Sequence, residues 1–276
     1  MSFHYRREYC GPLQAIILDW AGTTIDYGCR APAAVFIDVF KQRDIEVSIL
    51  EAREPMGMAK REHIRQILLM PRIAEQWRQK FDRSATEQDI DDIYRDFIPK
   101  QLESLPRYSD VIPGVPSFIE SCRSQGLKIG ATTGYNFEMM DICARQAAKQ
   151  GYSPDASFCA DDVPAGRPAP WMALACAMKM EVYPMESIVK IGDTYADIEE
   201  GLNAGMWTIG ISQTGNELGL SEAEVAKLEP AELEDRLLLI ESRMKRCGAH
   251  YTAHGVADCL AILEEIDDRL ASGDHP

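Results

Sequence analysis

A short apolar segment near the start of the chain ends in a single carboxylate, and this feature constrains the fold more than any other. Residues Ala15 to Leu18 are apolar, Asp19 follows them, and the small-residue turn Ala21-Gly22-Thr23-Thr24 comes next. Because Gly11-Pro12 precedes it, the segment is typical of a short strand buried on both faces of a parallel sheet. Ligands of open α/β sheets bind beyond the carboxyl ends of the strands, where Asp19 would lie. The alternative is that Asp19 only caps the next turn, a common role for aspartate.

Strands alternate with helices in the second half of the chain. This alternation predicts an α/β fold with a doubly wound parallel sheet. Right-handed crossovers then place all the strand carboxyl ends along one edge of the sheet. Further strands are expected at Leu127–Thr133, Ser157–Ala160, Ser187–Asp193, Trp207–Ile211 and His250–Thr252, with helices at 115–124, 137–149, 171–180, 196–203, 231–245 and 256–270.

The segment between Gly28 and Pro106 contains helical patterns, at 59–69, 73–81 and 87–102 among others, but no convincing strand. We therefore expect a helical cap domain, residues 29–106, inserted into a core domain of residues 1–28 and 107–276. Its two junctions should lie close together. An apolar stripe of Val35, Phe36, Val39 and Phe40 opens the block. Such stripes usually belong to a core, although one this aromatic is also suited to pairing with another subunit.

The composition argues against several classes of partner. The chain has 29 Lys and Arg against 44 Asp and Glu, a net charge of −15. An acidic surface repels nucleic acid and anionic lipid, so neither is an expected partner. No segment approaches the ~18 apolar residues of a membrane span, and no secretory signal is recognised. The eight cysteines lack metal-binding spacing and are expected to be reduced thiols of a cytoplasmic protein.

Polar residues of three kinds fall at the carboxyl ends of the expected strands: Asp19, Thr133, Arg167, Asp193 and Asp197. Three carboxylates at one edge repel one another unless a cation neutralises them, and all-oxygen sites suit Mg²⁺. A hydroxyl and a guanidinium suit a tetrahedral oxyanion. Each residue alone is compatible with an ordinary cap or surface charge. Together they indicate phosphoryl chemistry.

These positions resemble the motifs of the haloacid dehalogenase superfamily of phosphotransferases along the whole chain. Asp19 opens the first motif, Thr133 the second and Arg167 the third, and Gly192-Asp193-Thr-Tyr-Ala-Asp197 forms the fourth. The resemblance implies that Asp19 is a nucleophile that forms an aspartyl-phosphate. It also implies that Asp19 and Asp193 bind Mg²⁺, with Asp197 as a ligand or beside it, and that Thr133 and Arg167 hold the phosphoryl group.

The chain departs from that superfamily at Ala21. The usual motif has a second aspartate there, which protonates an alcohol leaving group, and loss of such an acid costs ~10²–10⁴ in rate. Lys60 and His63 offer another route, since their spacing puts them on one face of a helix. A lysine facing the phosphoryl site can form a Schiff base with an aldehyde, whose iminium lets a carbon–phosphorus bond break without that acid. The ordinary alternative is a solvated surface lysine.

A further set of motifs runs along the chain: Asp19-Trp-Ala-Gly-Thr-Thr, Cys29, Pro55-Met-Gly57, Lys60, His63, Pro71-Arg-Ile-Ala74, Thr133-Gly-Tyr135 and Gly166-Arg-Pro-Ala-Pro-Trp171. They resemble the phosphonatase branch of the superfamily, which hydrolyses phosphonoacetaldehyde to acetaldehyde and phosphate in 2-aminoethylphosphonate degradation. The resemblance implies that Lys60 forms the Schiff base and His63 shuttles protons. It implies that Met56, Cys29 and Tyr135 shape the pocket and that the carbonyl of Ala21 binds the metal. It further implies a homodimer that pairs cap to cap, which we expect to form through the stripe around Phe36.

Two other interpretations stay open at this point. A sugar-phosphate phosphatase or mutase of the same superfamily would need the acid that Ala21 replaces. An inert phospholigand sensor would have no need of the nucleophile Asp19 together with Lys60, Asp193 and Arg167.

Overall fold

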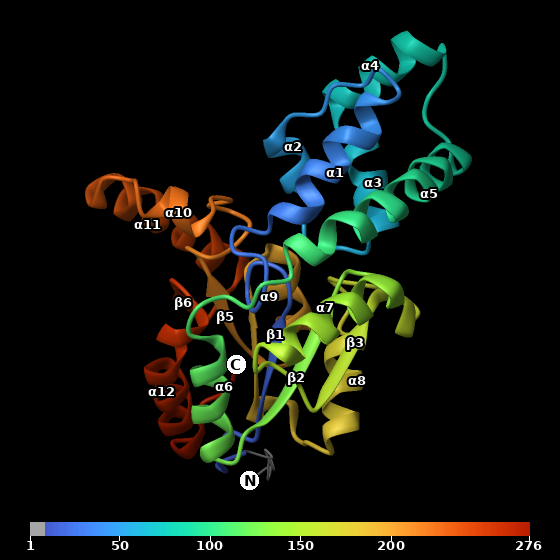
Figure 1. Cartoon of the computed structure of the whole chain (residues 1–276). Coiled ribbons are helices and arrows are strands. Elements are labelled where there is room, and N and C mark those ends of the chain that lie inside the picture. Colours follow the sequence, from blue (N-terminus) through green and yellow to red (C-terminus); the bar gives the residue numbers. More distant parts are fainter. Residues whose placement is uncertain (1–8) are drawn as a thin grey trace, which may run out of the picture.

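The computed structural model describes residues 9–276, and a six-stranded parallel sheet lies at its centre (Figure 1). The strand order is β3-β2-β1-β4-β5-β6, which confirms the predicted α/β fold with a doubly wound sheet. Because β1 is an inner strand, its last residue, Asp19, lies in the middle of the carboxyl edge. The strands are β1 (Ala15–Asp19), β2 (Lys128–Thr133), β3 (Ala156–Cys159), β4 (Ile188–Gly192), β5 (Trp207–Ile211) and β6 (Tyr251–Ala253).

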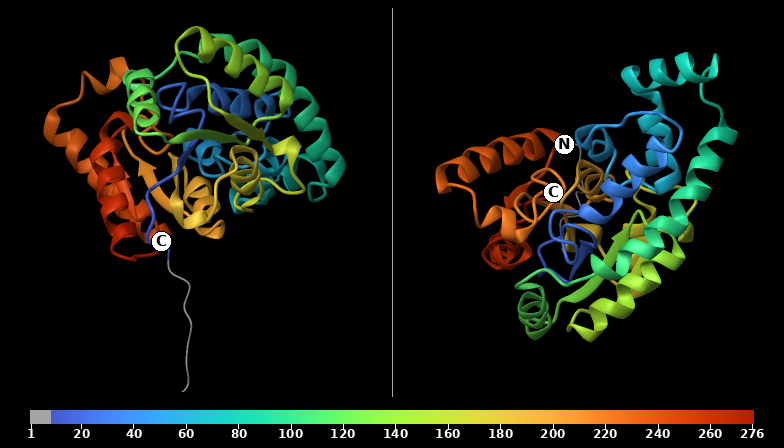
Figure 2. Two further views of the ribbon diagram at one scale, coloured as in Figure 1. Left: turned by 90° about the horizontal axis from the view of Figure 1, so that it is seen from below. Right: turned by 45° about the horizontal axis from the view of Figure 1, so that its top comes forward.

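Alternate residues of β1 pack into two separate apolar layers. Ile16 and Leu18 belong to a core that α6, α7 and α12 cover, whereas Ile17 packs with α8. Successive side chains of a strand point to opposite faces, so β1 is buried on both sides, as its sequence predicts. Figure 2 shows these helices on the two sides of the sheet. They and their neighbours are α6 (Val115–Ser124), α7 (Phe137–Lys149), α8 (Trp171–Met180), α9 (Tyr195–Asn203), α10 (Glu222–Val225), α11 (Pro230–Cys247) and α12 (Cys259–Ala271), with 3-10 turns at Leu105–Arg107, Ala160–Asp162, Met185–Ser187 and Val256–Asp258.

Helices α1 to α5 stand apart from the sheet, beyond its carboxyl edge (Figure 1). We call this group the helical insertion. Its two connections run side by side, since the amide of Ile112 donates to Thr24 O at 2.9 Å and the amide of Asp26 to Asp110 O at 3.2 Å. The junctions therefore lie together, as expected. The insertion consists of α1 (Arg30–Lys41), α2 (Ile49–Arg53), α3 (Lys60–Leu69), α4 (Pro71–Phe81) and α5 (Glu87–Ser104).

The prediction that the stripe around Phe36 forms a dimer surface is wrong. Val35 is 7% exposed and Phe36, Val39 and Phe40 are 0% exposed within the single chain. The ring of Phe36 stacks on Phe97 of α5, with ring centroids 4.5 Å apart. The stripe is thus the core of the helical insertion, and it leaves no apolar surface there for a second chain.

Two short helices, α2 and α10, carry no periodic signal in the sequence. Each begins at a capping box, in which serine accepts from the N3 amide and the N3 glutamate accepts from the serine amide. These reciprocal bonds satisfy amides at the helix start that have no partner within the helix. The helix expected from residue 73 begins at Pro71 instead, because the fixed φ of proline suits the first helical position.

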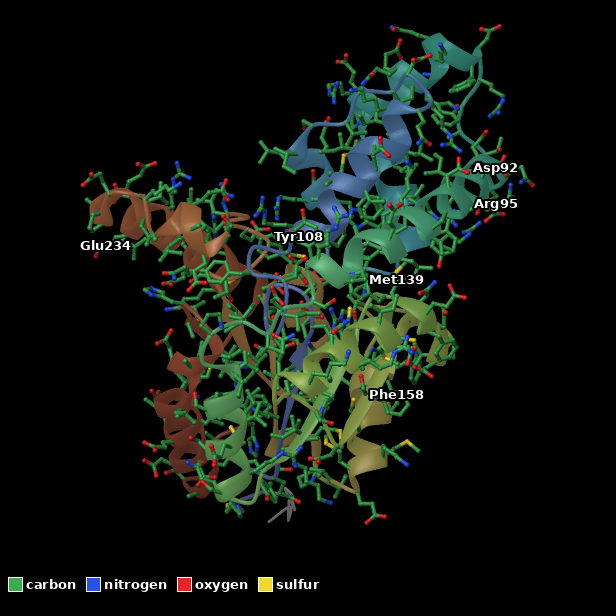
Figure 3. All side chains as sticks on the ribbon, viewed as in Figure 1. Asp92, Arg95, Tyr108, Met139, Phe158 and Glu234 are labelled. Carbon is green, nitrogen blue, oxygen red and sulfur yellow. The ribbon has the colours of Figure 1, made fainter. Side chains whose placement is uncertain are left out.

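Charged side chains cover the outer face of the helical insertion. Asp92 and Arg95 project from α5 (Figure 3) and form an ion pair at 2.9 Å. Glu234 projects from α11 in the same way (Figure 3). No helix among residues 9–276 has the length and apolar character needed to cross a membrane.

Candidate active site

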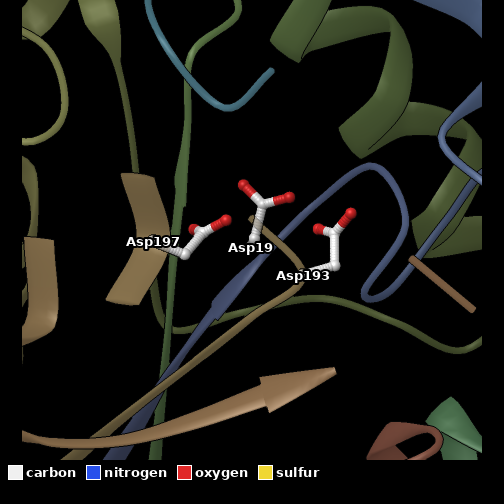
Figure 4. Close-up of side chains that lie close together, drawn as sticks. All are labelled: Asp19, Asp193 and Asp197. Atoms are coloured by element: carbon white, nitrogen blue, oxygen red, sulfur yellow. The ribbon is translucent and has the colours of Figure 1, made fainter. Parts of the chain in front are cut away.

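Three buried carboxylates meet at the carboxyl edge of the sheet. Asp19 ends β1, Asp193 follows β4, and Asp197 lies in the first turn of α9 (Figure 4). Each contributes one carboxylate oxygen, and these three oxygens all lie within 4.8 Å of one another. The sequence-predicted group of acids is therefore assembled from three separate segments, because parallel strands end at one edge.

Asp193 is held by the backbone and by a hydroxyl. Its Oδ2 accepts from the amide of Asn216 at 2.8 Å, and its Oδ1 accepts from Thr23 Oγ1 at 3.0 Å. A Cβ on Gly22 would lie 2.3 Å from Asp193 Oδ2, and the φ of Gly22 is +93°, so only glycine fits this turn. Burial first, and then the charges of Asp19 and Asp197, raise the pKa of Asp193 well above its usual range.

Asp197 is fully bonded by the protein itself. Its Oδ2 accepts from Thr194 Oγ1 at 2.6 Å, and its Oδ1 lies 2.6 Å from Lys190 Nζ and 2.9 Å from Arg167 Nη1. Burial alone would raise the pKa of Asp197, but the positive charges of Arg167 and Lys190 outweigh it and lower the pKa. Asp197 is therefore a compensated carboxylate, in contrast to Asp193.

Arg167 is clamped so that one of its nitrogens faces the carboxylates. Its Nε donates to Glu200 at 2.9 Å, and its Nη2 donates to the carbonyl and hydroxyl oxygens of Thr132 at 2.7 and 2.6 Å. Nη1 lies 2.7 Å from Asp19 Oδ1, yet this buried nitrogen has no hydrogen bond of good geometry among the described residues. A fixed donor in this state is suited to an incoming anionic oxygen.

Sequence reasoning missed Thr132, Lys190 and Glu200, which fix Arg167 and Asp197. Lys190 Nζ lies 3.5 Å from Glu200, and both side chains are 0% exposed. The position of Lys190 in the middle of an apolar strand could have indicated a buried acidic partner, because a buried charge requires one. Glu200 follows Asp197 by three positions, so it lies on the same face of α9.

The pKa of Asp19 depends on opposing effects of its neighbours. Burial, followed by the negative charge of Asp197, raises its pKa to about 6, and Arg167 and Lys190 act in the opposite direction. A second cation beside Asp19 and Asp193 would keep both ionised. The residues thus fit a divalent metal ion bound between these two carboxylates.

A small cavity joins the sheet edge to the helical insertion. It contains most of the predicted site residues, and Pro32, Gly57, Gly134 and Thr194 complete the wall. The predicted residues that line it are Asp19, Ala21, Cys29, Met56, Lys60, Thr133, Tyr135 and Arg167. Lys60 is thus not a solvated surface residue, and it shares one enclosed space with Asp19.

Lys60 is buried among aromatic rings at the start of α3. It is 5% exposed, and its Nζ lies 5.0 Å from the ring centre of Tyr135 and 5.9 Å from that of Phe36. Burial dominates and lowers the pKa of Lys60 from 10.5 to about 8. This shift raises the neutral fraction at pH 7 by roughly 300-fold.

His63 lies behind Lys60 and does not line the cavity. Its Nε2 lies 2.9 Å from Ala52 O, which assigns the proton to Nε2, and its ring stacks on Phe36 at 3.8 Å. Its buried Nδ1 has no hydrogen-bond partner among the described residues. Burial, and then the charge of Lys60, lower the pKa of His63 well below its usual range. The imidazole is therefore neutral, with a free lone pair.

The remaining wall of the cavity is apolar or uncharged. Cys29, at φ +47°, precedes α1, and burial, then Asp193 and Asp26, raise the pKa of its thiol well above its usual range. Tyr135 is buried and its hydroxyl has no hydrogen-bond partner among the described residues. Thr133 Oγ1 accepts from the amide of Tyr135 at 3.2 Å. These groups do not add charge to the site.

A sequence profile of haloacid dehalogenase-like hydrolases matches residues 13–205. A curated relative from Nitratidesulfovibrio vulgaris, named phosphonoacetaldehyde hydrolase, is 46% identical over 98% of this chain and 96% of its own. A relative of the same name from Bacillus cereus is 48% identical over 92% of this chain and 97% of its own. The chain belongs to the phosphonoacetaldehyde hydrolase family.

Solved structures agree with membership of the phosphonoacetaldehyde hydrolase family. The crystal structure of a phosphonoacetaldehyde hydrolase-like protein from Oleispira antarctica has a TM-score of 0.97 and 41% identity, with both chains covered in full. A hydrolase from Pseudomonas syringae, at 19% identity and a TM-score of 0.66, shares the fold alone. The chain is thus a hydrolase, and the resemblance predicted from its motifs is confirmed. Haloacid dehalogenase-like hydrolases generally use a divalent metal, which suits the three carboxylates.

Proposed function

We propose that this enzyme hydrolyses the carbon–phosphorus bond of phosphonoacetaldehyde to give acetaldehyde and phosphate. The observation that carries the proposal is a single cavity lined by Asp19, Ala21 and Lys60. It joins a nucleophile for phosphorus to an amine for an aldehyde, and it has no carboxylic acid at position 21. The names of the curated relatives support the same substrate.

We assign the metal as Mg²⁺, bound by Asp19, Asp193 and the carbonyl of Ala21. All-oxygen sites favour this ion, and when bound it neutralises the carboxylates and phosphoryl oxygens. Asp197 has the opposite role in this proposal, since its oxygens already accept hydrogen bonds from Thr194 and Lys190 and one of them forms an ion pair with Arg167. Asp197 holds the side chains of Lys190 and Arg167 in place beside the metal site.

The reaction begins at Lys60. Lys60 gives up a proton, its neutral amine adds to the aldehyde carbon, and the proton is taken up again as water leaves, which yields an iminium. His63 is neutral with a free Nδ1, so it accepts the proton that Lys60 loses and returns it later. Met56, Cys29 and Tyr135 line the cavity and exclude bulk water from the imine.

Cleavage follows at phosphorus. Asp19 attacks, the electron pair of the carbon–phosphorus bond moves into the iminium, and the products are an aspartyl-phosphate and a neutral enamine on Lys60. Thr133 and Nη1 of Arg167 hold the phosphoryl oxygens. Water then hydrolyses the aspartyl-phosphate, and protonation at carbon followed by hydrolysis of the iminium releases acetaldehyde and restores Lys60.

We also propose that residues 29–106 act as a cap domain over a core of residues 1–28 and 107–276. The contact between them is close, because a Cβ on Gly134 would lie 2.3 Å from Met58 O. Substrate entry then requires the helical insertion to lift away from Gly134. All eight cysteines are free thiols, which supports a reducing, cytoplasmic location.

Phosphate release separates this proposal from its rivals. With Mg²⁺, we expect release from phosphonoacetaldehyde and little from p-nitrophenyl phosphate. A phosphomonoesterase would prefer the second compound, and a phospholigand sensor would turn over neither. Either result would contradict the proposal.

The kcat/KM for phosphonoacetaldehyde should rise with pH, reach half of its maximum near pH 8 and level off above about pH 9. Below the pKa of Lys60, about 8, the reactive neutral amine increases about tenfold per pH unit. A steady-state profile from about pH 6 to about pH 10 measures this dependence. As a control, reductive trapping of acetaldehyde on Lys60 should follow the same curve, since it needs no Asp19. A profile that still climbs well above pH 9 would show that Lys60 is not shifted.

We further propose a homodimer through another face of the helical insertion. Leu50 is 76% exposed and Leu69 is 64% exposed, and Leu69 borders a groove with Pro55 and Met70. Sedimentation at micromolar concentration should give a dimer, and Leu50→Glu with Leu69→Glu should give a monomer. Leu238→Glu on α11, where the side chain is 58% exposed, is the control and should stay dimeric. A monomeric wild-type chain would refute the proposal.

A further inference from the structure

Arg53, the last residue of α2, joins the helical insertion to a loop of the core. Its Nη1 donates to Gly28 O at 2.9 Å and to the carbonyl and side-chain oxygens of Asn216 at 3.0 Å. Its Nη2 donates to Gly219 O at 3.1 Å, and Asn216 Nδ2 donates back to Arg53 O at 3.1 Å. One arginine therefore makes five hydrogen bonds across the boundary, all to neutral groups.

The loop that Arg53 grips is also the support of Asp193. The amide of Asn216, whose carbonyl and side chain bind Arg53, donates to Asp193 Oδ2 at 2.8 Å. A Cβ on Gly215 would lie 2.5 Å from Asp193 Cβ, so the loop packs directly on this carboxylate. Asn216 is 2% exposed, and it thus links the guanidinium to the acid in two steps.

The fit is specific to an arginine at this place. Gly219 has a φ of +67°, and a Cβ there would lie 2.7 Å from Arg53 Cζ. The planar guanidinium reaches several carbonyls at once, whereas an ammonium is a single point of charge. When the helical insertion lifts, these bonds must break, because Arg53 belongs to the insertion and its acceptors to the core and the junction.

We propose that Arg53 is a positioning residue that makes Mg²⁺ binding depend on closure of the helical insertion. In the closed state Arg53 fixes Asn216, and Asn216 aims Asp193 at the metal. Because such a coupling is reciprocal, Mg²⁺ in turn favours the closed state. The inference rests on the proposed function in two respects, the assignment of Asp193 as a metal ligand and the opening and closing of the helical insertion.

Calorimetric titration with Mg²⁺ alone, without phosphonate, tests the coupling. We expect the Kd for Mg²⁺ to rise about tenfold in Arg53→Met, within the usual range of such couplings, and to rise less in Arg53→Lys. Arg72→Met is the matched control, since Arg72 lies in the same insertion and, within residues 9–276, bonds to Glu51 and Glu46 of that insertion and to no residue of the core. Saturating Mg²⁺ should restore most of the kcat of Arg53→Met, which a merely unfolded variant would not show.

Hydrogen exchange tests the reciprocal effect. Mg²⁺ should slow amide exchange around residues 53–58 in the wild type and much less in Arg53→Met. If Arg53→Met does not fold, Asn216→Ala removes two of the five bonds and keeps the amide that binds Asp193, so it should shift the Kd in the same direction. An unchanged Kd in the folded variants would overturn the coupling alone, whereas a wild type that binds no Mg²⁺ would overturn the metal assignment as well.

Discussion

Lys60→Arg should abolish hydrolysis of phosphonoacetaldehyde, to below about a thousandth of the wild-type kcat/KM. Arginine keeps a positive charge beside Asp19 but cannot form an imine. In the wild type, borohydride added during turnover should reduce the iminium to a secondary amine on the peptide that contains Lys60. This inactivation should require phosphonoacetaldehyde or acetaldehyde, and mass spectrometry locates the label.

Lys60→Met is the control for Lys60→Arg, because it shows whether loss of the amine also affects thermal stability. Lys60→Met removes a buried amine whose charged form is disfavoured by burial, as its lowered pKa shows. The pKa of Lys60 is about 8 in the folded chain and 10.5 in the unfolded chain, so between these pH values the unfolded chain binds more protons. The free energy of unfolding therefore increases with pH in this range, and at pH 7 the buried ammonium still destabilises the fold. Lys60→Met should thus unfold at an equal or higher temperature and still be inactive. Retained hydrolysis in Lys60→Arg, or a label on another lysine, would reject the Schiff base.

Asp19→Asn should lower kcat to below about a hundredth of the wild type. The amide is nearly isosteric, so the fold is expected to persist, but it cannot attack phosphorus. Because Lys60 is untouched, the variant should still be labelled by borohydride with acetaldehyde. Rapid quenching of wild-type turnover should give a phosphorylated peptide that contains Asp19, and this peptide should be absent from the variant. Substantial turnover by Asp19→Asn would reject the nucleophile.

The regular elements were predictable because their signals are local. A buried strand such as Ala15–Asp19 has a continuous apolar run between turn residues, and long amphipathic helices such as α5 have a periodic pattern. The shared edge of a parallel sheet then brings Asp19, Asp193 and Asp197 together without further information.

What the sequence did not reveal depends on partners far along the chain. The stripe around Phe36 indicates a buried face, but its period does not say whether α5 or a second subunit covers it. Arg167 was predicted to hold phosphate, yet its orientation depends on Thr132 and Glu200, which are 35 and 33 residues away. Such buried networks form only when distant elements pack, so no local pattern marks them.

The two chemistries of the proposed reaction come from different parts of the fold. Asp19, Asp193 and Arg167 belong to the sheet edge, whereas Lys60 and the histidine beneath it belong to the helical insertion. On the proposed boundaries, an exchange of residues 29–106 for the corresponding segment of a distant relative should therefore change the substrate class, and it should keep the phosphoryl-transfer apparatus where the new segment supplies a counterpart of Arg53. Evolution of new specificities in such a chain can proceed by replacing one inserted module, and the same boundary offers a natural joint for building chimeric enzymes.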